Sequence, residues 1–426
     1  MSHGSQELEC RELTNGLRIN LLPDRSLPLV SVNLWYHVGS KNETAGRTGL
    51  AHLFEHMLFQ GSENVGTNDH FRWVQQAGGV ANGSTWYDRT NYFETLPAHQ
   101  LGLGLWLESD RMGFLLPGLD EDKLETQRQV VMNERRERVD NQPYGAAMER
   151  LNELLYPVGH PYRWPVIGYM DDIAAASLDE VRAFFSTYYT PANAVLSLVG
   201  DFLVEEAWDL VESYFGDLPW CAAPQRLESH DVHIPRAPGE SRAILPDRVA
   251  LARLYAGYRV PGVGTSAWYT ADVLAELLAG GKASPLYRDL VHDRQLAQDV
   301  SAYVLPMELE ATFLLVATAR PGVDPADIER RIETHLDRVG EHGPEEADLD
   351  RATNTILTSI ASRSQTFDRK ADLLSEYTTY FDDPTRLESD ADRYRAVGTE
   401  DVKSLLGDFL AADRCAAVTV VPAEAD

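Results

Sequence analysis

The sequence predicts an α+β protein of two homologous domains, each with a β-sheet packed against helices. Three observations carry this prediction. The chain has 426 residues, 44% of them apolar, which is enough for two domains with hydrophobic cores. A strand, a loop and a helix near the start of the chain recur about 220 residues later. Strands and helices do not alternate strictly, which argues against a doubly wound parallel sheet.

Charge and cysteine content narrow the class of protein. Asp and Glu number 66 against 38 Lys and Arg, and the net charge of −28 has the wrong sign for a nucleic-acid-binding surface. Cys10, Cys221 and Cys415 are too far apart for a disulfide framework or a cysteine-based zinc site. No apolar run approaches the ~20 residues that span a bilayer, and the first residues do not resemble a signal peptide. We expect a soluble, cytoplasmic protein that binds neither nucleic acid nor membrane.

The first domain, predicted at residues 1–222, starts its core with a strand and a helix. Residues 27–38 alternate apolar and polar side chains, as a half-buried strand does. A glycine-bearing loop then leads to a helix at about 48–59. This helix carries the polar residues considered below.

Three further elements complete the predicted first domain. Residues 120–139 form a charged helix that Pro143 ends. Residues 177–189 form a helix that opens with a Ser-Leu-Asp-Glu capping pattern. Residues 194–199 form a short apolar strand.

The predicted linker, residues 223–246, is rich in proline and polar residues and has no sustained hydrophobic period. The second domain follows at residues 247–426. It opens with a strand at 250–260 and a helix at 267–279. These two elements repeat the opening of the first domain.

The two opening helices can be aligned, residues 51–61 with 271–281. Their apolar positions and their final glycine agree, whereas His52, Glu55 and His56 have no counterpart in the second copy. We interpret this as a duplicated domain whose second copy keeps the scaffold without the polar site. The alternative is that two amphipathic helices look alike by chance.

His52, Glu55 and His56 form a candidate metal site. Their i, i+3, i+4 spacing places all three on one face of a helix. Two imidazoles one turn apart can hold zinc, and the carboxylate beside them can take a proton from water that the metal activates. The alternative is a pair of core histidines capped by a glutamate. That arrangement would be costly to bury among apolar neighbours unless each polar group had a partner.

A catalytic zinc site needs a third protein ligand, and the helix at 120–139 offers two candidates. Glu134 follows Val131 by three residues and Val130 by four, which places it on the predicted buried side. Glu137 shares part of that face but lies among arginines, so Glu134 is the first choice. A buried carboxylate needs a strong partner, and a metal would be one.

At this point the sequence resembles a known family, the pitrilysin family of zinc peptidases, or inverzincins. The resemblance covers nearly the whole chain and is closest to short bacterial members similar to the β-subunit of the mitochondrial processing peptidase. It is carried by the His-x-x-Glu-His motif of residues 52–56, by Glu134, and by the stretches at 82–85, 90–93, 160–162 and 189–194. It implies two homologous α+β domains, each with a mixed, mostly antiparallel sheet.

The resemblance also implies roles for single residues. His52, His56 and Glu134 would bind one zinc ion, and Glu55 would be the general base. Many family members have a second glutamate at the position of Gln127, where glutamine can hydrogen-bond but cannot act as an anion. We therefore expect Gln127 to support the metal ligands by hydrogen bonding, without binding the metal itself.

In the family, an extended peptide adds to the edge strand of the first sheet, which here would be residues 80–86. Such binding uses main-chain hydrogen bonds and tolerates many sequences. The expected contacts are Ala81, Asn82, Gly83, Ser84 and Thr85. The alternative is an ordinary strand of small residues.

The resemblance further implies a partner subunit. The family's second half supplies an arginine and a tyrosine, seven positions apart, that help hold the substrate. Val291 and Gln298 occupy those positions here. We therefore expect a heterodimer whose homologous partner supplies the missing pair, although a homodimer is possible.

The function expected from these residues is a zinc metalloendopeptidase that cleaves unfolded peptides, or a leader segment of one precursor, inside a closed chamber. The alternative is a non-catalytic scaffold or interaction subunit that retains the fold. Such subunits usually lose a ligand, and none is lost here. His70, His99 and His160 are expected to be structural or surface histidines.

Overall fold

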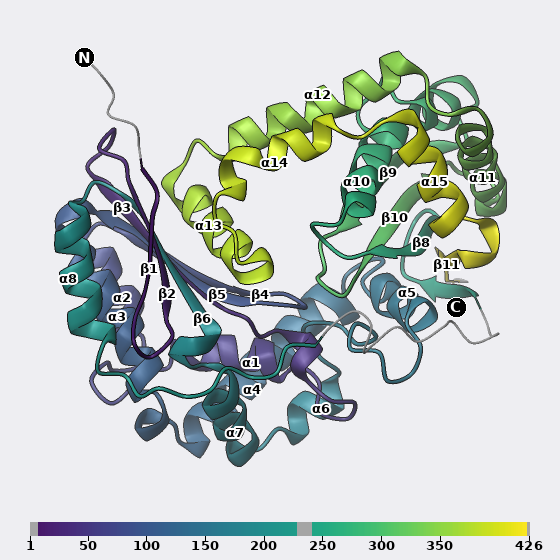
Figure 1. The fold of residues 1–426 in the computed structure, drawn as a ribbon. Coiled ribbons are helices and arrows are strands. Elements are labelled where there is room, and N and C mark those ends of the chain that lie inside the picture. The colour runs from purple at the N-terminus through teal and green to yellow at the C-terminus, as the bar shows by residue number, and fades with distance from the viewer. Residues whose placement is uncertain (1–6, 228–240, 424–426) are drawn as a thin grey trace. The chain divides into compact units, whose positions relative to one another are not determined.

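The computed structural model describes residues 7–227 and 241–423, which fold into two compact units. The first unit takes the chain up to residue 134, residues 165–226 and residues 363–388. The second unit takes the rest (Figure 1). Each unit therefore includes a segment from the opposite half of the chain.

The first unit is built on a six-stranded sheet with the order β1-β2-β6-β3-β5-β4. The neighbours β2 and β6 are parallel, and all other neighbours are antiparallel. The strands predicted at 27–38 and 194–199 correspond to β3 and β6. The strands are β1 (Glu9–Glu12), β2 (Arg18–Pro23), β3 (Leu29–Tyr36), β4 (Val80–Thr85), β5 (Thr90–Pro97) and β6 (Ala194–Gly200).

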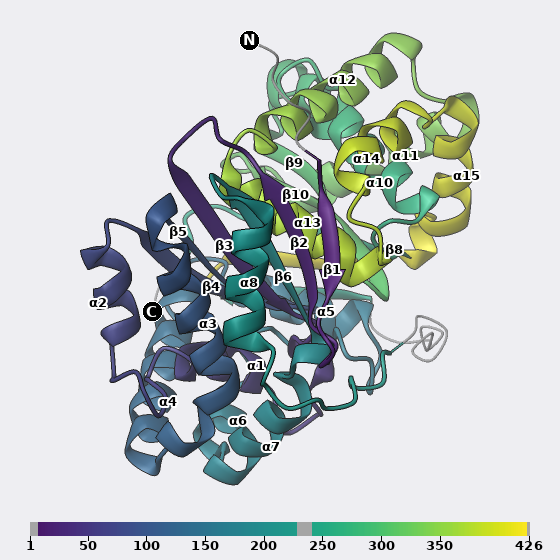
Figure 2. The ribbon, with the colours of Figure 1, turned by 60° about the vertical axis from the view of Figure 1, so that its left-hand side comes forward.

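Helices cover both faces of this sheet. The apolar side chains of β3, such as Val32 and Leu34, lie in the main core together with apolar side chains of helices α1, α3 and α8. Figure 2 shows α3 and α8 on this side of the sheet. Helix α13 covers the opposite face, where the indole of Trp35 donates a hydrogen bond of 2.9 Å to Asp372. The helices are α1 (Leu50–Met57), α2 (Asp69–Gln76), α3 (Leu101–Phe114), α4 (Glu121–Arg135), α6 (Met170–Ala175), α7 (Leu178–Tyr188), α8 (Val204–Phe215) and α13 (Phe367–Phe381).

The second unit has a five-stranded sheet with the order β7-β11-β8-β10-β9. Its strands β7 and β11 are parallel, and the other neighbours are antiparallel. This reproduces the order and the directions of β2-β6-β3-β5-β4 in the first unit, so the fold class of two homologous α+β domains is confirmed. The strands are β7 (Arg242–Asp247), β8 (Arg253–Pro261), β9 (Ala297–Leu305), β10 (Glu310–Ala319) and β11 (Ala416–Pro422).

Helices also cover the sheet of the second unit. Helix α5 comes from the first half of the chain and packs on β8, where a Cβ at Gly257 would lie 2.9 Å from Leu155. The glycine therefore permits the close approach of this helix. The helices are α5 (Ala147–Leu155), α10 (Ser266–Ala279), α11 (Pro325–His342), α12 (Glu346–Arg363), α14 (Arg386–Arg395) and α15 (Thr399–Phe409).

Short helical turns join these elements. The 3₁₀ turns are Ser40–Asn42, Ala98–Gln100, Leu116–Gly118, Pro191–Asn193 and Ala412–Arg414, and Arg136–Asp140 and Tyr287–Asp293 are π-helical. The helix predicted at 120–139 is thus α4 followed by a π-helical turn, a difference in winding that an apolar pattern does not distinguish. The capping pattern of α7 is confirmed, because the Ser177 hydroxyl accepts the N–H of Glu180 and the Glu180 carboxylate accepts the N–H of Ser177.

The predicted linker at 223–246 lies largely outside the described residues, which leave out 228–240. Its last residues belong to β7, an edge strand that pairs in parallel with β11. This strand was not predicted because it contains Pro246, and proline is tolerated in a sheet only at an edge or a bulge. The predicted domains 1–222 and 247–426 stay a prediction. In the part of the chain that the structure describes, no helix is both long and apolar enough to cross a membrane.

Candidate metal centre and substrate strand

Helix α1 buries one face and turns the other toward the candidate site. Its apolar side chains fill the core of the first unit, namely Ala51, Leu53, Phe54 and Met57. His52, Glu55 and His56 lie on the opposite face and are only partly buried. The rings of the two histidines lie 4.8 Å apart between centroids, so both can reach one metal ion.

The first turn of α1 is held by a carboxyl group from outside the helix. Gly49 precedes the helix with φ of 86° and offers no side chain as a cap. Glu43 takes that role, since its two oxygens accept the N–H groups of Gly49 at 2.9 Å and Ala51 at 2.7 Å. Burial raises the pKa of Glu43 to about 8, and the backbone donors oppose the rise. The metal-binding face of α1 is therefore fixed from its N-terminus.

Helix α4 brings Glu134 to the two histidines. Leu124 and Val131 anchor the helix in the core, and Glu134 points from the same side. One Glu134 oxygen (Oε2) lies 3.3 Å from Nε2 of His56 and 3.8 Å from Nε2 of His52. Tertiary structure thus joins residues that are 78 positions apart.

One expectation about α4 needs correction, and the structure also shows where the second candidate ligand lies. Val130, expected on the buried side with Glu134, is 42% exposed, because the buried stripe runs through Leu124, Gln127 and Val131. Glu137 lies exposed in the π-helical turn and does not join the histidines.

The three donor groups fit zinc. Two imidazole nitrogens and one carboxylate oxygen are ligands that zinc accepts, and three protein ligands leave one position open, as in catalytic sites. The three donor atoms lie within 4.8 Å of one another. Ligands placed about 2.0–2.1 Å from a tetrahedral ion are about 3.3 Å apart, so small side-chain shifts suffice to close the site.

Glu55 lies beside the three donors and has a different partner. The Thr85 hydroxyl donates a 2.6 Å hydrogen bond to its carboxylate. Burial raises the pKa of Glu55 above its ordinary value, and the hydrogen bond from Thr85 and the charges of His56 and Arg89 oppose this rise. Gln127 is buried on α4, two turns before Glu134. Its expected support of the ligands stays a prediction.

Strand β4 lies at the edge of the sheet, next to α1. The N–H of Trp86 bonds to the carbonyl of Arg89 in the turn, so alternation along the ladder points the main-chain groups of Asn82 and Ser84 toward β5. The main-chain groups of Ala81, Gly83 and Thr85 therefore face the open edge. Of the five expected contacts, these three offer the backbone groups that an added strand needs.

Gly83 allows β4 to approach the helix. A Cβ at this position would lie 3.2 Å from ring atoms of Phe59 and Tyr92 and 3.3 Å from Cγ of Glu55. The N–H of Gly83 donates to the side-chain oxygen of Asn82 at 2.9 Å. The Asn82 side chain therefore occupies a donor that a peptide strand would use.

A second group of titratable side chains is buried under β5. His70 lies 3.0 Å from Glu94, and Arg111 forms an ion pair with Glu108 and lies 3.5 Å from Glu94. The guanidinium of Arg111 also stacks 4.1 Å from the ring of Tyr92. Its positive charge opposes a metal ion here. This group could not be predicted from the sequence, since its members come from three separate elements.

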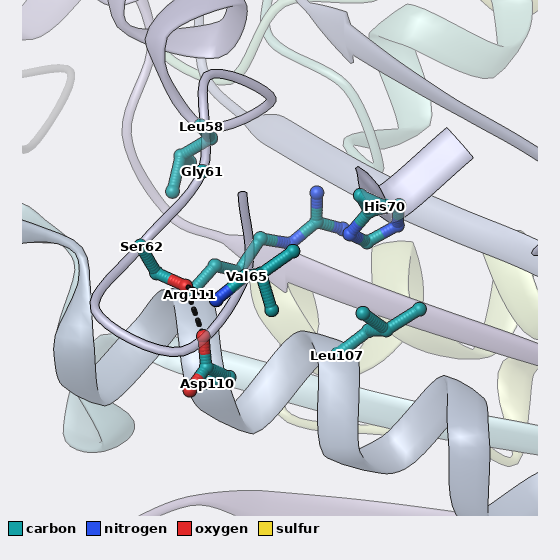
Figure 3. Close-up of a pocket in the computed structure, with 8 residues that line it drawn as sticks. All are labelled: Leu58, Gly61, Ser62, Val65, His70, Leu107, Asp110 and Arg111. Atoms are coloured by element: carbon teal, nitrogen blue, oxygen red, sulfur yellow. Dashed lines mark hydrogen bonds between the residues drawn. The ribbon is translucent and has the colours of Figure 1, made fainter. Parts of the chain in front are cut away.

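A small pocket adjoins this group, and Figure 3 shows the Arg111 side chain reaching toward His70 there. Its other lining residues are Leu58, Gly61, Ser62, Val65, Leu107 and Asp110. No residue of the candidate metal centre lines it.

Among the described residues, His99 and His160 do not belong to the donor group formed by His52, His56 and Glu134. His160 is buried in the second unit with its Nε2 3.4 Å from Glu310, and His99 is exposed in a 3₁₀ turn. In helix α10, the positions aligned with His52, Glu55 and His56 are Asp272, Ala275 and Glu276. Asp272 accepts a hydrogen bond from Tyr394 at 3.0 Å.

Comparison with known proteins identifies the family. The model described as "Insulinase (Peptidase family M16)" matches residues 20–160, and "Peptidase M16 inactive domain" matches residues 175–356. The chain is 32% identical to "Zinc protease PqqE" of Helicobacter pylori over 367 residues, which are 86% of this chain and 82% of that protein. The chain belongs to the insulinase family of peptidases. The resemblance to zinc peptidases of this family is thereby confirmed.

Solved structures of insulinase-family proteins share the fold. A protease from Helicobacter pylori superposes with a TM-score of 0.90 at 29% identity and covers 98% of this chain and 100% of its own. A structure from Pseudomonas fluorescens, titled as a peptidase M16 inactive domain, has a TM-score of 0.87 at 18% identity and 99% coverage of both chains. The second likeness concerns the fold alone.

Proposed function

We propose that this chain is a zinc metalloendopeptidase that cleaves unfolded peptides, or the leader segment of a precursor peptide. One observation carries the proposal: His52, His56 and Glu134 converge, with Glu55 beside them and an open strand edge next to Glu55. The relative named as a zinc protease supports the same reading.

Each residue has a defined role in this proposal. His52, His56 and Glu134 hold one zinc ion, which when bound supplies a Lewis acid that polarises the peptide carbonyl and makes water more acidic. A carboxylate oxygen of Glu55 takes a proton from the attacking water and passes it to the nitrogen of the leaving amine. Gln127 would hydrogen-bond to a metal ligand as a neutral group.

The substrate binds as an added strand at β4. Its main chain pairs with Ala81, Gly83 and Thr85, whose N–H and C=O groups face the open edge, while Asn82 and Ser84 flank them. The Asn82 side chain must leave the N–H of Gly83 for this pairing. Since the contacts are to the backbone, the site selects extended, unfolded chains. The acidic net charge of −28 favours basic peptides among them.

A homologous second subunit completes the enzyme in this proposal. Val291 and Gln298 stand where the resemblance implies an arginine and a tyrosine, and Val291 is buried whereas Gln298 is exposed on β9. A heterodimer would supply the pair from the other chain. Full cleavage of peptides by the pure chain alone, well above the concentration at which subunits associate, would contradict this part of the proposal.

We further propose the cytoplasm as the compartment. Cys10 and Cys221 are exposed thiols, which suits a reducing environment.

The test is peptide cleavage followed by mass spectrometry, with zinc content measured on the same samples. A long, unstructured, basic peptide is incubated with the wild type, Glu55→Gln and Glu134→Gln. We expect Glu55→Gln to keep about one zinc per chain and to lose about 10²–10⁴-fold in kcat, the usual share of general acid–base catalysis. We expect Glu134→Gln to lose at least about 10–100-fold in zinc affinity.

The matched control is Glu137→Gln, which changes an exposed glutamate one turn further along the chain. It should leave both zinc content and cleavage unchanged. Equal loss of zinc in Glu55→Gln and Glu134→Gln would show that the roles are assigned wrongly. Zinc in the wild type without any cleavage would point to the missing partner or to a scaffold role.

A further inference from the structure

We infer that Thr85 is a positioning residue that holds the carboxylate of Glu55 in place when a peptide adds to β4. The inference rests on the proposed function, since it takes Glu55 as the group that moves the proton. It assigns to the Thr85 side chain a role separate from the backbone contact already proposed for this residue.

The first observation is the hydrogen bond itself. The Thr85 hydroxyl lies 2.6 Å from Oε2 of Glu55, which is the distance of a strong bond to a carboxylate. Glu55 has three side-chain torsions, so a carboxylate without this bond could take several orientations. Its base function needs one orientation, toward the water and the scissile bond.

The second observation is that the Thr85 side chain is itself fixed. Thr85 ends β4 opposite Thr90 of β5, and their hydroxyl oxygens lie 3.5 Å apart. The Thr90 hydroxyl donates to the carbonyl of Val38 at 2.9 Å, which anchors it to the core side of the sheet. A β-branched side chain also has few χ1 rotamers. The fixed hydroxyl of Thr85 can therefore hold the carboxylate of Glu55 in one orientation.

The third observation links Thr85 to the substrate. The main-chain N–H and C=O of Thr85 face the open edge of β4, whereas its side chain points to α1. A peptide that pairs with this edge bonds to the same residue that orients Glu55. Gly83, two residues earlier, lets β4 lie close to Glu55, since a Cβ at that position would be 3.3 Å from Cγ of Glu55. Thr85 therefore contacts the substrate through its main chain and orients Glu55 through its side chain.

The kinetic test compares Thr85→Val with Thr85→Ser. Valine keeps the branched shape and the backbone contact but removes the hydroxyl, so we expect kcat to fall about 10–100-fold with KM nearly unchanged. Serine keeps the donor and should restore most of the wild-type kcat. Zinc content and thermal midpoint should not change in either variant. Thr95→Val is the matched control, since it makes the same substitution on β5 and should keep wild-type kcat.

A readout independent of cleavage separates this inference from the proposed function. High-resolution crystal structures of the metal-free wild type, Thr85→Val and Thr85→Ser show the position of the Glu55 carboxylate. We expect Glu55 next to residue 85 in the wild type and the serine variant, and turned to other rotamers in the valine variant.

Three outcomes would overturn the inference. They are an unmoved Glu55 carboxylate in Thr85→Val, an equal loss of kcat in Thr85→Val and Thr85→Ser, and loss of zinc in Thr85→Val. If no protein cleaves the peptide, either the partner subunit is missing or the chain is a scaffold, and the crystal structures alone decide the role of Thr85.

Discussion

At the scale of single residues, the buried group under β5 shows how a fold can hold charge in its interior. His70, Glu94, Glu108 and Arg111 are all buried, and burial raises the pKa of both glutamates. Burial and the nearby charge of Arg111 lower the pKa of His70 to about 3. His70 is therefore neutral in the folded protein. We assign its proton to Nε2, where it can be donated to Glu94.

The lowered pKa of His70 predicts a loss of stability in acid. The unfolded chain binds a proton at His70 near pH 6.5 and the folded protein only near pH 3, so the stabilisation is complete above pH 6.5 and is lost as pH falls toward 3. Between pH 7 and pH 5 the loss should be about 2 kcal/mol. The difference in the free energy of unfolding between the wild type and His70→Gln should therefore decrease by this amount from pH 7 to pH 5.

The measurement is the free energy of unfolding of both proteins at pH 7, 6 and 5 in the presence of a chelator. Because the two proteins differ only at residue 70, the contribution of every other group cancels in the difference. A difference that stays constant with pH would show that His70 is not held neutral by the fold.

The candidate site shows which residues a sequence can place. Helical spacing put His52, Glu55 and His56 on one face, and the apolar stripe of α4 favoured Glu134 over Glu137, because both arguments depend on the period of one helix. The hydrogen bond from Thr85 to Glu55 could not be predicted, since it depends on how β4 packs against α1. Side chains that meet only through tertiary packing leave no spacing in the sequence.

At the scale of elements, helix α1 depends on a neighbour for its first turn. Eight residues are too few for a stable isolated helix, so tertiary contacts decide whether it forms. Glu43 satisfies the N–H groups of Gly49 and Ala51 from outside the helix. Helix α10, which has a clear apolar period, was predicted to within one residue, whereas the predicted ends of α1, β3 and β8 differ from the observed ends by up to three residues. The edge strand β7 was missed, because it is short and contains proline.

Removal of the Glu43 cap should weaken both the fold and the metal site. Glu43→Ala leaves two buried N–H groups without their acceptor, and we expect a loss of about 1–3 kcal/mol in the free energy of unfolding. Zinc affinity should also fall, because the first turn of α1 carries His52. Thermal unfolding and zinc titration measure the two effects.

The exposed Glu63→Ala serves as the control for this change, with an expected effect within about 0.5 kcal/mol. A Glu43→Ala protein with wild-type stability and zinc affinity would show that α1 needs no cap from outside.

At the scale of the whole molecule, the two halves of the chain exchange segments. Residues 363–388 complete the first unit and residues 135–164 complete the second. Helix α13 binds the first sheet through polar contacts as well as apolar ones, for example from Ser375 to Ser197 at 2.8 Å and from Asn20 to Thr378 at 2.9 Å. Neither predicted domain therefore contains all the helices that cover its sheet.

The predicted domains 1–222 and 247–426 should consequently fail to fold well when each is produced alone. The first fragment lacks α13, which leaves Trp35 and Val199 without their covering helix. The second lacks α5, which packs on β8. We expect each fragment alone to bind a hydrophobic dye or aggregate, and the two produced together to co-purify with a cooperative thermal transition.

The undivided chain is the reference for this experiment. A soluble, monomeric fragment 1–222 with the thermal midpoint of the undivided chain would contradict the role given to the exchanged helices and would support the simple division at residue 222.

The exchange of segments also sets an order of events during synthesis. The last strand of the first sheet is complete at residue 200. Helix α13, which covers the face of this sheet opposite the main core, ends only at Phe381. At about 5–20 residues per second, the ribosome needs roughly 10–40 s to make the chain between these points. Throughout that interval the nascent sheet exposes Trp35 and its polar neighbours. The newly made chain should therefore depend most on chaperones before Phe381 has been translated.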